Sequence, residues 1–208
     1  MRQLSKITLV LFLTSICCSC ASTSLVDTWR NPGLRPERLQ RVIVVSITKK
    51  DANRRVYEEM LSGELSRRGV QAVAGYTRFP SGERIDWNML DKAVKNAAAQ
   101  AVLTVQTIKV EQQTTIQPGY VGSYPGYWYP EAFPTWSLHG YYGSMAHYGP
   151  SYISTYDIAT IQVNLFEASS GKLLWAATFT SSEPEKVISV SQDLARLVVE
   201  SLVKEGLI

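Results

Sequence analysis

The chain has 208 residues, of which 45% are hydrophobic and 19% charged, and its formal net charge is +3. These values are typical of a folded soluble protein with one domain or at most two, and they exclude collagen-like, wholly disordered and polytopic membrane chains. Residues 1–19 contain Arg2 and Lys6 and no acidic residue, so the net charge without them is +1. Because a near-neutral domain lacks the basic surface that nucleic acid requires, we expect no nucleic-acid partner.

Residues 1–20 have the layout of a secretory signal peptide. Two basic residues precede a short apolar stretch at 7–16, which is far below the roughly 20 residues of a membrane-spanning helix. The small residue Ser19 then precedes Cys20. A cysteine at the cleavage point resembles a bacterial lipoprotein signal, in which the cysteine is acylated and becomes the first mature residue. We therefore expect residues 1–19 to be removed and Cys20 to be lipidated. The alternatives are a plain secretory signal and an uncleaved N-terminal anchor.

The cysteines support the lipoprotein interpretation. All three lie at positions 17, 18 and 20, so the folded part has no partner for a disulfide. We expect no metal site there, because two of the three belong to the leader. Palmitate-type chains on Cys20 contribute roughly 0.8 kcal/mol per buried methylene group and would anchor the protein to a membrane. Cys20 is followed by Ala21 rather than Asp, which, by resemblance to Gram-negative lipoproteins, implies the outer membrane and a domain on its periplasmic face.

The remainder predicts one α/β domain at 41–208, preceded by an extended segment at 20–40 with a short strand near 25–29. Apolar runs and helical periodicity then predict the order strand, helix, strand, helix, strand, at 41–47, 54–68, 70–74, 87–99 and 101–108. An alternating pattern predicts an antiparallel hairpin and a last helix, at 155–166, 172–181 and 188–204. We expect a mixed sheet of about five strands with helices on both faces.

A long loop at 118–152 interrupts this pattern. It contains eight of the eleven tyrosines, two of the five tryptophans, both histidines and a single charged residue, Glu131. Loops of this length inside a domain are functional or disordered. Aromatic side chains suit a lipid interface, a partner protein or the sugar rings of a cell-wall glycan. The candidate binding surface consists of Tyr120, Tyr124, Tyr127, Trp128, Tyr129, Trp136, Tyr141 and Tyr142.

Several motifs together resemble a family of bacterial envelope lipoproteins of unknown function. They are Cys-Ala-Ser-Thr, Asp-Thr-Trp-Arg-Asn-Pro, Arg-Arg-Val-Tyr-Glu, Arg-Gly-Val-Gln-Ala and Asn-Leu-Phe-Glu-Ala-Ser-Ser-Gly-Lys-Leu-Leu-Trp, at 20–23, 27–32, 54–58, 68–72 and 164–175. The resemblance covers nearly all of the mature chain. It implies a membrane-anchored domain facing the periplasm, and it brings no catalytic residue with it.

No motif of the chain predicts an enzyme. The Gly-Lys pair at 171–172 lacks the earlier glycine and the following Ser or Thr of a phosphate-binding loop, so it indicates a hairpin turn. Glu58 and Glu59 are interpreted as the solvated face of a helix. We therefore expect a non-enzymatic binding or scaffolding module without cofactor or metal. One alternative is a cell-wall-directed hydrolase that uses His139 or His147, with Ser144 and Asp157 near them in the sequence. Another is a carrier of a small apolar ligand.

Overall fold

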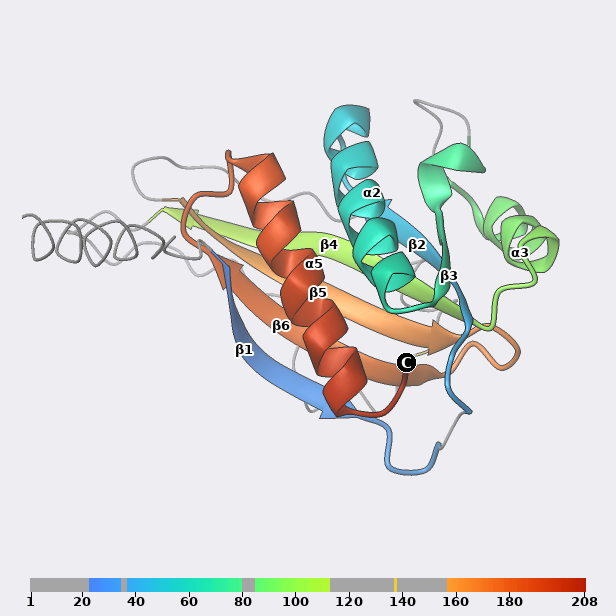
Figure 1. The fold of residues 1–208 in the computed structure, drawn as a ribbon. Helices are drawn as coiled ribbons and strands as arrows, with labels where there is room; N and C mark the ends of the chain where they lie inside the picture. The colour runs from blue at the N-terminus through green and yellow to red at the C-terminus, as the bar shows by residue number, and fades with distance from the viewer. Residues whose placement is uncertain (1–22, 35–36, 80–84, 113–136, 138–156) are drawn as a thin grey trace, which may run out of the picture.

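The computed structural model describes residues 23–34, 37–79, 85–112, 137 and 157–208. Six strands form one mixed sheet in the order β1-β6-β5-β4-β2-β3, with helices on both faces (Figure 1). In chain order the elements are β1 (Thr23–Arg30), β2 (Arg41–Ile47), α2 (Asp51–Arg67), β3 (Gln71–Ala74), the 3-10 turn η2 (Gly75–Thr77), α3 (Trp87–Asn96), β4 (Ala101–Gln112), β5 (Asp157–Glu167), β6 (Leu173–Ser181) and α5 (Val187–Lys204).

The parallel part of the sheet confirms the predicted alternation. β2 lies between β3 and β4 and pairs with both in parallel register. Its run from Val42 to Val45 is buried, as expected for β-branched residues in a strand that is covered on both faces. α2 ends at Arg67, and Gly69 follows with φ 84°, a left-handed conformation that lets the chain turn directly into β3.

The antiparallel part contains the predicted hairpin and the short strand expected near 25–29, which is longer than predicted. β5 and β6 form the predicted hairpin, and Gly171 in its turn has φ 67°. The Gly-Lys pair is therefore a turn, as predicted. The extended N-terminal segment contributes β1, which pairs antiparallel with β6 and forms one edge of the sheet. β3, with only four residues, forms the other edge.

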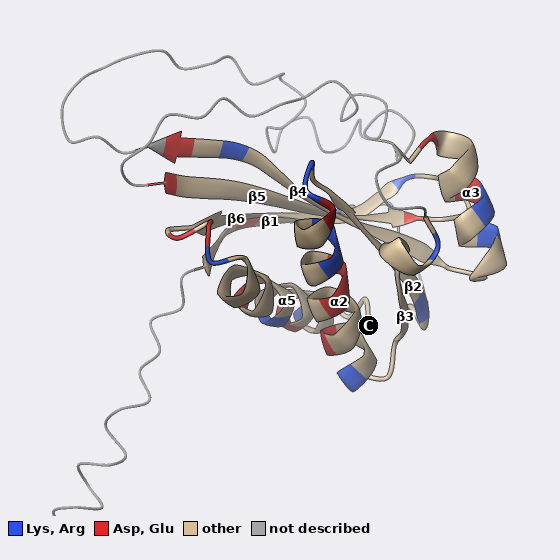
Figure 2. Ribbon diagram, turned by 90° about the horizontal axis from the view of Figure 1, so that it is seen from above, with Lys and Arg blue, Asp and Glu red and all other residues tan. Residues whose placement is uncertain are grey.

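Two helices, α2 and α5, pack side by side on one face of the sheet, as Figures 1 and 2 both show. The main apolar core lies between them and the strands. Its largest fully buried side chain is Trp175, and it also contains Leu61 of α2 and Leu194 of α5. Burial of such side chains stabilises each by about 2–3 kcal/mol relative to exposure, so this face is the main source of stability.

The opposite face is covered by α3 over the β2 and β4 end of the sheet (Figure 2). The Asp86 side chain caps this helix by accepting the backbone N–H of Met89 at 2.8 Å. Leu90 is fully buried against a second apolar cluster that includes Phe166. The helix ends three residues earlier than predicted, and Ala98, which lies beyond its end, is exposed and has φ 45°.

Candidate functional site

Most of the predicted functional residues lie outside the described part of the chain. This holds for Cys20, for His139, His147 and Ser144, and for the candidate binding surface of Tyr120, Tyr124, Tyr127, Trp128, Tyr129, Trp136, Tyr141 and Tyr142. Of the predicted loop, Ser137 is described, and it forms an isolated antiparallel bridge with Lys172 in the hairpin turn. Asp157 is also described and begins β5.

Residues from four strands lie in one row near one end of the sheet. Thr23 of β1 lies opposite Ser181, Ser181 lies opposite Ala159, and Ala159 lies opposite Val110 of β4. At about 4.8 Å between neighbouring strands, this row spans about 14 Å. β4 ends two residues beyond Val110 and β5 begins two residues before Ala159, so the segment between these strands leaves and re-enters the sheet at this end. We call it the anchor end, because the chain continues there from Thr23 towards Cys20, the predicted site of lipidation.

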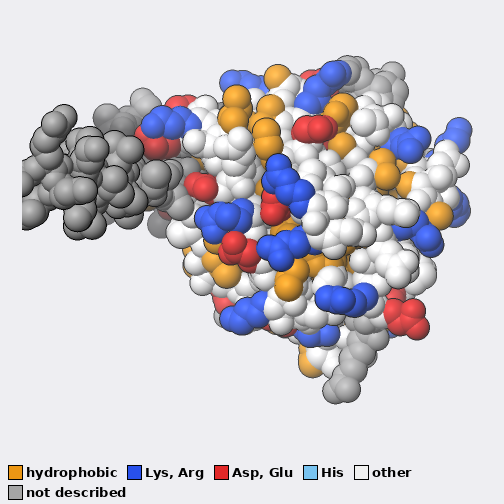
Figure 3. All heavy atoms as spheres, in the orientation of Figure 1, with side chains coloured by type: hydrophobic (Ala, Val, Ile, Leu, Met, Phe, Trp, Pro, Cys, Tyr) orange, Lys and Arg blue, Asp and Glu red, His pale blue; other side chains and the backbone are white. Residues whose placement is uncertain are grey.

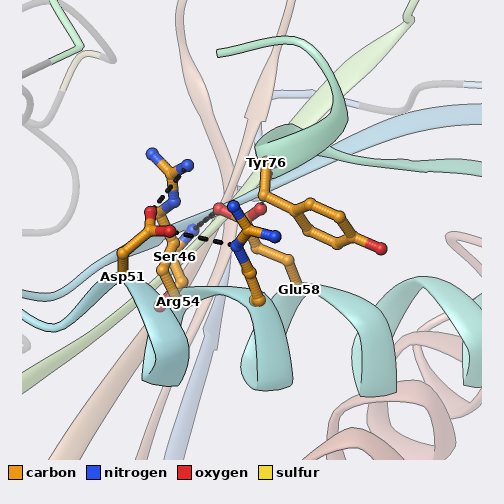
Figure 4. A network of polar contacts seen from close by, with 6 residues as sticks. Ser46, Asp51, Arg54, Glu58 and Tyr76 are labelled. Atoms are coloured by element: carbon orange, nitrogen blue, oxygen red, sulfur yellow. Dashed lines mark hydrogen bonds and ion pairs between the residues drawn. The ribbon is translucent and has the colours of Figure 1, made fainter. Parts of the chain in front are cut away.

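A buried cluster of charged and polar groups lies at the carboxyl ends of β2 and β3 (Figure 4). Its centre is Glu58 of α2, whose side chain is fully buried. One carboxylate oxygen accepts the backbone N–H of Ser46 at 2.9 Å, and the other accepts the backbone N–H of Tyr76. Arg54, of which 5% is exposed, pairs through its side chain with Asp51 at 3.0 Å one turn earlier on the same helix.

Burial dominates the electrostatics of this cluster. It raises the pKa of Glu58 to about 7, against the lowering effects of the two backbone N–H groups and of the Arg54 charge. The interpretation of both acids as a solvated face is therefore wrong for Glu58. Glu59 is exposed, and its carboxylate accepts the Tyr76 hydroxyl at 2.7 Å, which raises the pKa of that tyrosine.

Helical spacing contains the signal that this interpretation missed. Arg54, Glu58, Leu61 and Leu65 follow one another at intervals of four, three and four residues, which places them on one face of a helix. Since Leu61 and Leu65 are fully buried, the face they share with Glu58 is directed at the sheet. The sequence interpretation placed both acids on the solvated face of the helix and so missed the burial of Glu58.

The hydrogen bonds of Glu58 give it a structural role, because they connect three elements of the fold. Both of its oxygens hold backbone N–H groups, so the side chain joins α2 to the end of β2 and to the turn after β3. Gly75 permits this approach, because a Cβ atom there would lie 2.8 Å from the Val44 carbonyl oxygen and 3.3 Å from a Glu58 carboxylate oxygen. We therefore assign the cluster around Glu58 a role in the stability of the fold.

A second polar group lies on the sheet face opposite α2 and α5. Gln162 and Asn164 of β5 are fully buried, and Gln162 donates to the Asn164 side-chain oxygen at 3.1 Å. Thr178 of β6 donates to Gln162 at 2.9 Å. Gln106 lies opposite Gln162 on the β4 side. Strand alternation alone places these amides on one face, but it does not tell whether that face is solvated.

An open depression of about 750 Å³ lies at the opposite end of the sheet, beside α3. Four charged residues on its walls bond to other groups of the protein. Lys95 pairs with Asp91 at 2.6 Å, Arg41 donates to the Ala98 carbonyl at 2.7 Å, and Glu167 accepts the Ser170 hydroxyl at 2.5 Å. Each of these four groups already has a partner in the protein, so the charged side chains do not converge on one ligand position as they do in typical binding pockets.

Two further observations concern the described residues only. In this part of the chain no three His, Cys, Asp or Glu side chains lie close enough together to hold a metal ion. None of its helices combines the length and the apolar character that crossing a bilayer requires. Over α2 and α5 the surface mixes basic and acidic side chains (Figure 3), and ion pairs such as Arg196–Glu200 at 3.4 Å join them.

Comparison with known proteins gives structural similarities of low score. No protein-family model matches the chain, and no curated protein matches it in sequence. A PelC dodecamer from Paraburkholderia phytofirmans matches with TM-score 0.45 and 15% identity, over 86% of this chain and 96% of that chain. The lipoprotein GNA1162 from Neisseria meningitidis matches with TM-score 0.36 and 11% identity, over 80% of this chain and 95% of that chain. At these values the similarities carry no argument about function.

Proposed function

We propose that the chain is a lipid-anchored protein of a bacterial envelope, whose α/β domain is a non-enzymatic binding or scaffolding module. Acylated Cys20 is its anchor, and the outer membrane, with the domain on the periplasmic side, is its location. The signal sequence supports the anchor, because a basic start, a short apolar stretch and Ser19-Cys20 are what acylation at a cysteine requires.

The position of Thr23 is the main observation that supports the proposal. Only Ala21 and Ser22 separate Cys20 from this first residue of β1, and Thr23 is paired and 3% exposed. The folded sheet therefore begins almost at the anchor, with no long linker between them. A domain fixed in this way is held at the membrane surface, which suits a module that works on membrane-bound or envelope-bound partners.

The aromatic loop fits this arrangement. β4 ends at Gln112 and β5 begins at Asp157, both at the anchor end, and the loop at 118–152 lies in the sequence between these two residues. Gln112 and Asp157 are thus within a few strand spacings of the point where the chain continues to Cys20. A loop rich in tyrosine and tryptophan that starts next to a lipid anchor is suited to a membrane-proximal protein partner or to a cell-wall glycan.

Two experiments test the proposal in the producing bacterium. Mass spectrometry of the mature N-terminus should find a diacylglyceryl and acyl group on Cys20, and Cys20→Ser should move the protein from the membrane to the soluble fraction. An unmodified N-terminus, or a Cys20→Ser variant that still sediments with membranes, would refute the anchor.

Photoreactive residues placed through 118–152 test the binding module. We expect capture of the same envelope component from several positions, and loss of this capture when the loop is replaced by a Gly/Ser linker of equal length. Unchanged capture after that replacement would remove the loop from the binding surface, while the anchor would stand on its own test.

A further inference from the structure

We infer that the anchor end of the domain contacts the lipid surface itself, through a patch formed by Leu25, Val26 and Ile188. This inference rests on the proposed lipid anchor and adds to it a contact made by the folded domain. The partner is the interfacial layer of a phospholipid membrane.

Exposure singles out these three side chains. Among the described residues, five large hydrophobic side chains are exposed, and the three highest exposed fractions are 61% for Ile188, 59% for Val26 and 42% for Leu25. The other two are Trp87 and Val203, at 38% and 37%. A single exposed apolar residue needs no explanation, whereas several of them gathered at one place indicate an interaction site.

The sheet register and the start of α5 place these residues at the same end of the sheet. Leu25 lies directly opposite Phe179, so both side chains point to the face of the sheet that α5 covers. Ser181 pairs with Thr23, and five residues separate it from Val187, the first residue of α5, which Ile188 follows. Figure 1 shows that β1 and α5 begin at the same end of the sheet.

The backbone at Val26 favours contact with a lipid surface over pairing of β1 with a strand of another chain. The register of β1 shifts between Leu25 and Asp27, which makes Val26 the extra residue of a bulge. In addition, the Asp27 carboxylate accepts the backbone N–H of Thr28 at 2.8 Å, so this part of the free edge is already bonded. A bulge and an occupied N–H both oppose pairing with the strand of another chain. A lipid surface needs no backbone hydrogen bonds from its partner.

The few residues between Cys20 and β1 hold the patch close to the membrane. Three residue steps separate Cys20 from Thr23, which is a reach of at most about 11 Å, and Leu25 is two steps further on. Amphipathic protein surfaces that bind membranes insert about 5–10 Å into the headgroup region. The patch thus lies within reach of the layer in which the acyl chains of Cys20 are embedded. The polar surroundings, including Ser24 and the Lys186–Glu183 ion pair at 2.6 Å, suit a shallow contact.

Site-specific fluorescence on the acylated mature protein tests this inference. In the lipidated mature protein the leader cysteines are absent and the Cys20 sulfur carries the diacylglyceryl group, so a newly introduced cysteine is the one free thiol. The variants Val26→Cys, Ile188→Cys and Val203→Cys are labelled with the environment-sensitive dye NBD. They are reconstituted in vesicles of phosphatidylethanolamine and phosphatidylglycerol, with or without brominated acyl chains. Val203 is the matched control, because it is an exposed aliphatic residue at the far end of the same helix.

We expect the dye at positions 26 and 188 to show a blue-shifted emission and at least twofold quenching by brominated lipid, and the dye at position 203 to show neither. If the protein floats with the vesicles but all three positions remain in a water-like environment, the inference is wrong and the anchor stands. If the wild-type protein does not float with vesicles, the proposed anchor fails, and this inference fails with it.

Discussion

The carboxylate of Glu58 accepts the backbone N–H of Ser46 at 2.9 Å, and this bond ties α2 to the carboxyl end of β2. The second oxygen holds the N–H of Tyr76 in the turn that follows β3. A buried acid that links α2 to the end of β2 and to the turn after β3 should contribute measurably to stability.

The free energy of unfolding should depend on pH through Glu58. Burial raises the pKa of Glu58 from 4.5 to about 7, so the folded state binds its proton more tightly than the unfolded chain does. Its contribution to stability is then fully present below about pH 4.5 and is lost as the pH rises through 7. The loss is at most about 3 kcal/mol. Urea unfolding between pH 5 and pH 8, followed by tryptophan fluorescence, measures it.

Two variants test whether Glu58 causes this pH dependence of the unfolding free energy. Glu58→Gln removes the titrating group, so its unfolding free energy should lose this fall between pH 5 and pH 8. It should also be less stable at pH 5 by about 1–3 kcal/mol, because one backbone N–H loses its acceptor. Glu59→Gln, at an exposed position on the same helix, should keep the wild-type slope. An unchanged slope in Glu58→Gln would show that another group titrates.

Gly75→Ala should destabilise the protein by about 1–3 kcal/mol. The new methyl group would lie 2.8 Å from the Val44 carbonyl oxygen, which belongs to a buried strand and cannot move away freely. Gly63→Ala in α2 is the control, since a Cβ atom there meets nothing within 4 Å and alanine favours helix by about 1 kcal/mol. Thermal unfolding of both variants should therefore shift in opposite directions. A stable Gly75→Ala protein would contradict the packing around Glu58.

The buried amides should behave as a coupled pair. Asn164→Leu leaves one side-chain N–H of Gln162 without its acceptor in a buried position, so we expect a loss of about 1–3 kcal/mol. Adding Gln162→Met removes that unpaired donor, and the double variant should recover part of the loss. A double-mutant cycle from urea unfolding gives the coupling energy, which we expect to be about 1 kcal/mol. Additive losses would mean that the bond contributes nothing.

Leu90→Ala should destabilise α3 more than the rest of the domain. Leu90 is fully buried, and α3 is a ten-residue helix that covers only one end of its sheet face. The expected cost is about 2–5 kcal/mol. Hydrogen exchange should show faster exchange for α3 amides, while α2 and α5, which pack against each other, keep their protection. Uniform loss of protection over all three helices would show that α3 unfolds only together with the whole domain.

The sequence by itself determined the elements whose signals are local. The β-branched run from Val42 to Val45 identifies a buried strand, and Gly69 and Gly171 mark turns because glycine adopts positive φ readily. The alternation of strands and helices was enough to predict a parallel βαβ unit and an antiparallel hairpin, and both are present. Such patterns depend on residues a few positions apart, so they can be recognised without knowledge of the fold.

Only the tertiary structure decided what depends on distant partners. β1 enters the sheet through pairing with β6, and Ser24 bonds to Thr180, 156 residues later. Glu58 is buried because β2 and the turn after β3 close over it, and Gln162 is buried on the polar side of an alternating strand. Burial of a polar group is a property of what the fold places over it, and hydrophobic periodicity records only which side chains share a face.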